Sequence, residues 1–114
     1  MFEQDNAKYD EYEMALQRAL LVFPADHRVV IFYIGCGRGQ LIYSCVNASK
    51  KTNRNIVVYA IEKNPYPIQT LKRRIAKNKW VNLVHIVESD VRDWQPEMQA
   101  DIFLSELLGG FGDN

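Results

Sequence analysis

The sequence is poor in the residues that build disulfide frameworks and metal sites. Its 114 residues include two cysteines, Cys36 and Cys45, and two histidines, His27 and His85. The cysteines lack the CxxC spacing of a metal site and any disulfide framework. The histidines belong to no paired ligand pattern, so we expect no metal. Isolated cysteines are typical of a reduced, intracellular protein, and we therefore expect a cytoplasmic or nuclear one.

The chain also lacks a net charge and a long apolar segment. Fourteen basic residues balance fourteen acidic ones, which argues against a dedicated nucleic-acid or membrane-surface protein. No apolar run is long enough to cross a bilayer, so we expect no membrane partner. Nine basic residues nevertheless lie between Lys50 and Lys79. We expect the solvated face of a helix there, with a phosphate-binding patch as the alternative.

Against this background one stretch stands out, VVIFYIGCGRGQ, from Val29 to Gln40. Its six apolar residues predict a strand buried on both faces, and the glycines after them predict a tight turn. Similar strands alternate with helices along the chain, which predicts an α/β fold with a parallel sheet of about four strands and helices on its faces. The predicted helices are 6–22, 40–50 and one capped by Asn64, and the predicted strands are 29–34, 56–61, 82–87 and 100–105.

Each predicted strand delivers a glycine or an acid at its end. Gly35 and Gly37 follow the first strand, Glu62 ends the second, Asp90 follows the third and Glu106 follows the fourth. The carboxyl ends of parallel strands share one edge of the sheet, where ligands bind in such folds. We therefore expect a ligand site at this edge.

The residue types favour a nucleoside, with alternatives at every position. The glycines form GxGxG, and Gln40 stands where the dinucleotide fingerprint has its last glycine, which weakens a nicotinamide reading. Glu62 suits two ribose hydroxyls or a salt bridge with Lys63. Asp90 suits an adenine amino group, with Val91 against the ring, or it is a turn residue or a helix cap. A carboxylate between apolar segments needs a cationic partner. For Glu106 we expect either an internal lysine or arginine, or a cationic substrate.

Taken together, the motifs resemble the class I S-adenosylmethionine-dependent methyltransferases, and more narrowly the protein arginine methyltransferases of the symmetric-dimethylating, type II branch. Five segments carry the resemblance: KY at residues 8–9, GCGRG at 35–39, YAIEKNP at 59–65, SDVRDW at 89–94 and SELLGGFGDN at 105–114. It implies a Rossmann-like fold, S-adenosyl-L-methionine as cofactor with S-adenosylhomocysteine as product, and arginine-containing protein substrates such as histone tails or RNA-binding proteins. It also implies no direct nucleic-acid binding, and an accessory protein for the longer parent protein to which this chain would belong.

The resemblance further implies a role for each matching residue. Glu106 would be the first glutamate of the double-glutamate loop and bind the target guanidinium, and Phe2 would shape the arginine pocket and favour symmetric dimethylation. The residues expected to bind the cofactor are Lys8 and Tyr9 at its methionyl carboxylate, Glu62 at its ribose, and Asp90 and Val91 around its adenine, while Gly35 and Gly37 would pass beneath the cofactor.

The chain departs from the family pattern in its extent. The second glutamate of the loop would fall one residue beyond Asn114, and the later strands, the β-barrel and the amino-terminal domain of the type II enzyme are missing. We therefore expect residues 1–114 to be a truncated S-adenosylmethionine-binding subdomain, inactive alone and prone to self-association through an exposed sheet edge. The alternatives are a nicotinamide-dependent Rossmann oxidoreductase, or a non-enzymatic interaction module that uses the basic helix.

Overall fold

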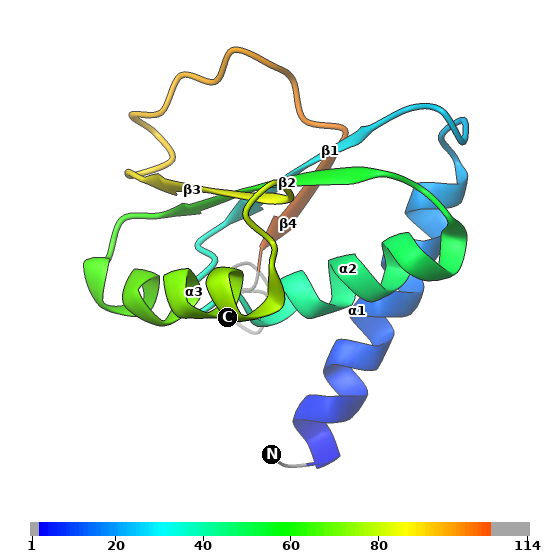
Figure 1. Ribbon diagram of the computed structural model, residues 1–114, viewed down its shortest axis with the longest axis horizontal. Coiled ribbons are helices and arrows are strands. Elements are labelled where there is room, and N and C mark those ends of the chain that lie inside the picture. The colour runs from blue at the N-terminus through cyan, green and yellow to red at the C-terminus, as the bar shows by residue number, and fades with distance from the viewer. Residues whose placement is uncertain (1–2, 106–114) are drawn as a thin grey trace, which may run out of the picture.

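A parallel sheet of four strands forms the centre of the molecule (Figure 1). The computed structural model describes residues 3–105, with side chains from Tyr9 onward. The strands lie in the order β3-β2-β1-β4, and all three neighbouring pairs are parallel. The predicted α/β architecture is therefore confirmed. The strands are β1 (Val29–Ile34), β2 (Ile56–Glu62), β3 (Val84–Glu88) and β4 (Ile102–Ser105).

The described helices cover one face of this sheet, and an irregular segment, residues 89–101, arches over the other (Figure 1). The helices are α1 (Glu3–Leu21), α2 (Gln40–Thr52) and α3 (Pro65–Asn78). The chain steps in one direction from β1 through β2 to β3, and right-handed crossovers then place α2 and α3 on the same face. None of the helices in the described part is long and apolar enough to span a membrane.

The core lies between the helices and the sheet. Alternate strand residues point toward the helices, as the period of two requires. The fully buried side chains of this layer include Val29, Ile31 and Tyr33 of β1 and Val58 and Ala60 of β2.

The opposite face carries aromatic side chains. Phe32 packs there against Tyr59, Phe103 and Trp94, with ring centroids 5.9, 5.7 and 4.8 Å away. Trp94 comes from the irregular segment and covers part of this face, whereas Phe103 on β4 remains 68% exposed.

Local sequence signals explain where the helices begin and end. Asn64 caps α3 by accepting a hydrogen bond from the backbone N–H of Tyr66 at 3.0 Å, and Pro65 occupies the first turn, as predicted. In α1, Leu16 and Leu20 are buried four residues apart, in the predicted apolar stripe.

Several element boundaries differ from the prediction: α1 begins at Glu3 rather than residue 6 and ends one residue earlier, β2 and β3 each end one residue later, and β4 begins at Ile102 rather than residue 100. Two further differences have a visible cause. The third strand begins at Val84 rather than at residue 82, because the carbonyl of Trp80 accepts the N–H groups of both Leu83 and Val84, at 2.8 and 2.9 Å. Those bonds keep the preceding residues in a turn. The second helix continues to Thr52, whose hydroxyl donates to the carbonyl of Ala48 at 2.7 Å.

Candidate functional site

The order in which the chain adds strands to the sheet reverses at β1, and the candidate site lies there. The strand β1 has β2 on one side and β4 on the other, so the chain leaves β1 toward one edge and returns beyond it. Ligands bind at such a switch point, outside the carboxyl ends of the strands. A hollow of about 120 Å³ lies at this place, and we call it the strand-end hollow. Its lining residues are Ile34, Gly35, Ile61, Glu62, Lys63, Ser89, Asp90 and Val91.

The glycine turn, residues 35–39, borders this hollow through Gly35. The N–H groups of Gly35 and Cys36 both donate to the carbonyl of Ile61, at 2.9 and 3.2 Å, which ties the turn to β2. Gly37 has a φ of 54°, and a methyl group added there would meet nothing within 4 Å. Gly39 has a φ of 80°, and the same addition would lie 2.5 Å from Cδ1 of Leu71. Gly37 therefore leaves open space, whereas Gly39 permits close packing of the turn against α3.

Glu62 links the glycine turn to the start of α3. Its Oε1 accepts the N–H of Gly37 at 2.8 Å, and its Oε2 accepts the N–H of Asn64 at 3.0 Å. Within the described residues no cation pairs with Glu62, so the alternative of a salt bridge with Lys63 is not the arrangement observed. A carboxylate has about four acceptor positions, so two remain for the hydroxyls of a ligand.

Asp90 lines the strand-end hollow and pairs with Arg92. Its Oδ1 accepts the backbone N–H and the Nε–H of Arg92, at 3.0 and 3.1 Å, and its Oδ2 accepts from Nη2 at 2.8 Å. The backbone bond is the turn that the sequence left open as an alternative. These hydrogen bonds from Arg92 hold the pKa of Asp90 well below its ordinary value, so the carboxylate is ionised at neutral pH.

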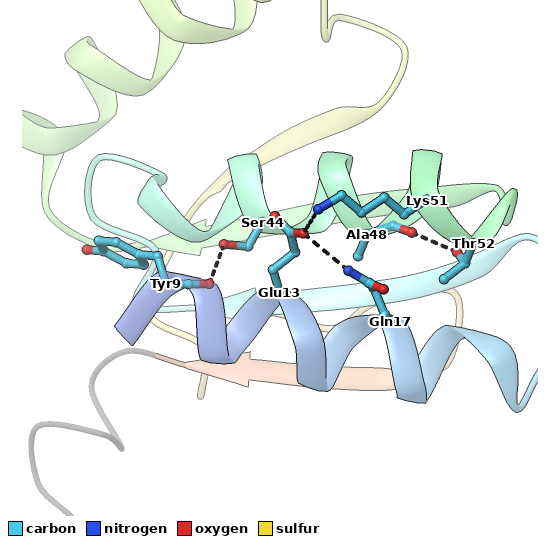
Figure 2. A network of polar contacts seen from close by, with 7 residues as sticks. All are labelled: Tyr9, Glu13, Gln17, Ser44, Ala48, Lys51 and Thr52. Carbon is cyan, nitrogen blue, oxygen red and sulfur yellow. Dashed lines mark hydrogen bonds and ion pairs between the residues drawn. The ribbon is translucent and has the colours of Figure 1, made fainter. Parts of the chain in front are cut away.

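Tyr9 lies in a separate hollow between α1 and α2. Figure 2 shows how α1 is held along α2: Ser44 donates to the carbonyl of Tyr9 at 3.4 Å, and Glu13 pairs with Lys51. The hydrogen bond from Lys51 is also the main reason why the pKa of Glu13 lies below its ordinary value. This interhelix hollow has a volume of about 170 Å³. Its lining residues are Tyr9, Asp10, Glu13, Gln40, Tyr43, Ser44 and Asn47.

The predicted site residues thus fall into three groups. The strand-end hollow brings together Gly35, Glu62, Asp90 and Val91, and Gly37 joins them through its bond to Glu62. Tyr9 lines the interhelix hollow instead, which also contains Gln40 at the end of the glycine turn. Lys8 belongs to α1, but its side chain lies outside those described, and so do Phe2 and Glu106.

Two residues that support the site were missed from the sequence. Arg74 of α3 donates from Nη1 to the carbonyl of Arg38 at 2.8 Å and to Oε1 of Gln40 at 2.9 Å, so it braces the glycine turn. Tyr33 lies fully buried, and its hydroxyl accepts the N–H of Leu41 at 3.3 Å, where Gly39 offers no capping side chain. No sequence pattern indicates either contact, because each joins segments whose relative placement depends on the tertiary fold.

The other basic residues of α3 and its C-cap have the solvated character that was predicted. Lys72, Arg73, Lys77 and Lys79 are exposed. Lys72 forms an exposed ion pair with Glu88, with Nζ and Oε1 3.2 Å apart.

Solved structures with this arrangement define its class. The chain superposes on coclaurine N-methyltransferase, solved with N-methylheliamine and S-adenosylhomocysteine, with a TM-score of 0.66 and 20% identity over 93% of this chain and 28% of that one. A methyltransferase from Thiobacillus denitrificans, solved with S-adenosylhomocysteine, has a TM-score of 0.60 and 17% identity over 83% of this chain and 35% of that one. The fold is therefore that of the class I S-adenosylmethionine-dependent methyltransferases.

Sequence comparison narrows this class to one family. The family "PRMT5 arginine-N-methyltransferase" matches residues 1–114. Relatives include protein arginine N-methyltransferase 5 of Drosophila melanogaster, 44% identical over 100% of this chain and 20% of its own length, and that of Oryza sativa subsp. japonica, 42% identical over 99% and 18%. Protein arginine N-methyltransferase skb1 of Schizosaccharomyces pombe is 37% identical over 100% and 18%. The chain belongs to the PRMT5 arginine-N-methyltransferase family.

This membership confirms the predicted resemblance to protein arginine methyltransferases and favours it over the nicotinamide-dependent alternative. The chain spans about a fifth of the length of these relatives.

Proposed function

We propose that this chain is the S-adenosylmethionine-binding part of a protein arginine methyltransferase that forms symmetric dimethylarginine. The observation that carries the proposal is the strand-end hollow, where Gly35, Glu62 and Asp90 meet from the ends of three strands in a chain of this family. The hollow offers backbone, carboxylate and apolar surface together, which is the combination that a nucleoside needs.

The observed contacts support each part of the proposed cofactor site. Glu62 has acceptor positions left for the two ribose hydroxyls, and Asp90 can accept the adenine amino group while Val91 packs against the ring. Gly35 and Gly37 pass beneath the cofactor, where Gly37 leaves open space. When bound, the cofactor supplies a methyl group already activated by a sulfonium.

The remaining roles rest on the family pattern. We assign Lys8 and Tyr9 to the methionyl carboxylate, with Tyr9 beside Gln40 in the interhelix hollow. Glu106 would hold the target guanidinium by bidentate hydrogen bonds and direct one nitrogen toward the methyl group. Its negative charge would also stabilise the guanidinium during transfer. Phe2 would shape the arginine pocket and favour the symmetric product.

The cofactor proposal is tested by calorimetry with S-adenosylhomocysteine on the full-length protein. We expect binding, and we expect Asp90→Ala to weaken it at least about tenfold, because a charge-assisted hydrogen bond is lost. Asp93→Ala is the matched control, since Asp93 is an exposed acid outside the hollow. Failure of the full-length protein to bind would refute the proposal.

Activity is tested by mass spectrometry of an arginine-rich peptide, such as a histone tail, after incubation with the full-length protein and cofactor. We expect symmetric dimethylarginine, and we expect Glu106→Gln to abolish it. We propose that residues 1–114 form an S-adenosylmethionine-binding subdomain, and they span about a fifth of the length of the relatives. The 114 residues alone should therefore be inactive, and robust turnover by them would contradict this.

The proposed partners of the parent are arginine-containing proteins, among them histone tails and RNA-binding proteins, together with an accessory protein. The proposed setting is the cytoplasm, the nucleus or both, where such substrates occur.

We also propose that the 114-residue chain self-associates when it is expressed alone. In the described part, β4 is an edge of the sheet and carries the exposed ring of Phe103. Leu107, Leu108 and Phe111, which we expect to add apolar surface, lie outside the described residues. Sedimentation velocity should show association that rises with concentration and is weakened by Phe103→Lys. A strictly monomeric chain at high concentration would contradict it.

A further inference from the structure

Arg92 encloses one side of the Asp90 carboxylate at the rim of the strand-end hollow. Its guanidinium makes two nearly parallel hydrogen bonds, Nε to Oδ1 at 3.1 Å and Nη2 to Oδ2 at 2.8 Å, while its backbone N–H donates to Oδ1 at 3.0 Å. Two planar groups joined in this way have a fixed relative orientation. The plane of the carboxylate is therefore set by the residue two positions further along the chain.

The contacts also limit what else Asp90 can bind. Each carboxylate oxygen has about two acceptor positions. Oδ1 already accepts two N–H groups, whereas Oδ2 accepts one. One acceptor position therefore remains, on Oδ2. Because the carboxylate is ionised, it has no proton to donate, so the open position suits an amino group and repels a carbonyl oxygen.

We propose that Arg92 is a positioning residue that sets the base selectivity of the site, favouring 6-amino over 6-oxo purines. This inference rests on the proposed function, in which Asp90 faces the purine base. Arg92 acts through Asp90: it holds the carboxylate in one orientation and leaves a single acceptor for the amino group. Without Arg92, the carboxylate can rotate and solvent can occupy the freed positions. A carboxylate that rotates and is hydrated can also accept the ring N1–H of a 6-oxo purine. The preference for 6-amino over 6-oxo purines therefore falls.

The ion pair between Arg92 and Asp90 contributes little to the stability of the fold. The Arg92 side chain is 82% exposed, and exposed ion pairs contribute little to the free energy of unfolding. Substitution of Arg92 should therefore leave the fold intact, and changes in ligand binding can be read directly.

The test compares two ligands by calorimetry on the full-length protein: S-adenosylhomocysteine and its 6-oxo counterpart, S-inosylhomocysteine. Wild type should prefer the adenine ligand. In Arg92→Ala we expect adenine binding to weaken about tenfold while inosine binding changes little, so the preference falls by a similar factor. Arg92→Lys keeps the charge but loses the planar fork, and should recover only part of the preference. Arg73→Ala, an exposed arginine on α3, should match wild type.

The outcomes separate this inference from the proposed function. If Arg92→Ala keeps the wild-type preference, or weakens both ligands equally, Arg92 does not set selectivity. Tighter adenine binding by Arg92→Ala would mean that Arg92 competes with the base, which also overturns the proposal. Full recovery by Arg92→Lys would show that charge alone suffices and contradict orientation by the fork. A wild type that binds neither ligand would refute the proposed function together with this role.

Discussion

Glu62 has one task that the structure shows and a second that we propose, and both use the same side chain. Its two oxygens accept the N–H groups of Gly37 and Asn64, so it fixes the glycine turn and the start of α3 relative to β2. Glu62 also lines the hollow where we propose that a ribose binds, and its remaining acceptor positions are available for the ribose hydroxyls. A carboxylate is well suited to this combination, since every position on it accepts.

Glu62→Gln keeps the size of the side chain and changes only its hydrogen-bonding groups, so it tests both tasks without removing the side chain. In Glu62→Gln one oxygen becomes an NH₂ group that faces a backbone N–H, so one of the two hydrogen bonds is lost. We expect the free energy of unfolding to fall by about 1 kcal/mol and S-adenosylhomocysteine affinity to fall at least about tenfold. Glu88→Gln is the control, because Glu88 occupies the register position beside Glu62 on β3 and pairs with exposed Lys72. Equal effects in both variants would contradict the role assigned to Glu62.

The sequence predicted which residues reach the site better than it predicted their partners. Gly35, Glu62 and Asp90 were expected at one edge because each lies at or just after the end of a predicted strand, and all three line the hollow. The bond from Gly37 to Glu62 spans 25 residues and that from Arg74 to Arg38 spans 36. Such contacts depend on sheet register and helix packing, which a single sequence does not encode locally.

At the scale of elements, the glycine turn and α2 form a unit that packs on α3. The glycines at positions 37 and 39 have the same left-handed backbone but different surroundings. A Cβ at Gly39 would lie 2.5 Å from Leu71 and 3.1 Å from Ile42, whereas at Gly37 it would meet open space. These two positions therefore provide a matched pair of substitutions.

The two alanine variants should separate stability from binding. Each adds a backbone cost of about 1 kcal/mol for the left-handed conformation. Gly39→Ala should lose about 1–3 kcal/mol more, because overpacking displaces Leu71. Denaturant unfolding of the chain measures this difference, and calorimetry should show that Gly37→Ala loses more affinity per unit of lost stability. Equal unfolding free energies for the two variants would show that the close contact with α3 is absent.

At the amino-terminal end of the sheet, Asp101 contacts Val30 and His27, and we call this set of contacts the clasp. We expect its contribution to stability to fall in acid. Oδ2 of Asp101 accepts the N–H of Val30 at 2.8 Å and lies 2.9 Å from Nε2 of His27, joining the start of β1 to β4. The hydrogen bond from Val30, helped by His27, holds the pKa of Asp101 below its ordinary value of 3.8. A carboxylate whose folded pKa is depressed stabilises the fold above its unfolded pKa, and this contribution is lost as the pH falls through the folded value.

Asp101→Asn removes the titrating group and should reduce this acid sensitivity. We expect the variant to be less stable than wild type near neutral pH, by about 1 kcal/mol, and the difference to shrink as the pH falls below about 4. Denaturant unfolding across this range measures it, with Asp26→Asn, an exposed acid near His27, as the control. A difference that stays constant with pH would contradict the clasp.

At the scale of the whole molecule, strand alternation predicted a parallel sheet, and the structure confirms it. The order β3-β2-β1-β4 was not predicted, because apolar runs show that strands are buried and not which strands are neighbours. That order is what places the switch point at β1 and the glycine turn beside it. The aromatic face around Phe32 was also unexpected, since its residues come from three strands and an irregular segment.

We propose that the strand-end hollow binds S-adenosylmethionine and not a nicotinamide dinucleotide. The most direct test is a calorimetric titration of the full-length protein with S-adenosylhomocysteine and, separately, with NADH. We expect that S-adenosylhomocysteine binds, that NADH does not, and that Glu62→Gln and Asp90→Ala each weaken the binding. Binding of NADH without S-adenosylhomocysteine, or S-adenosylhomocysteine binding that neither substitution affects, would contradict it.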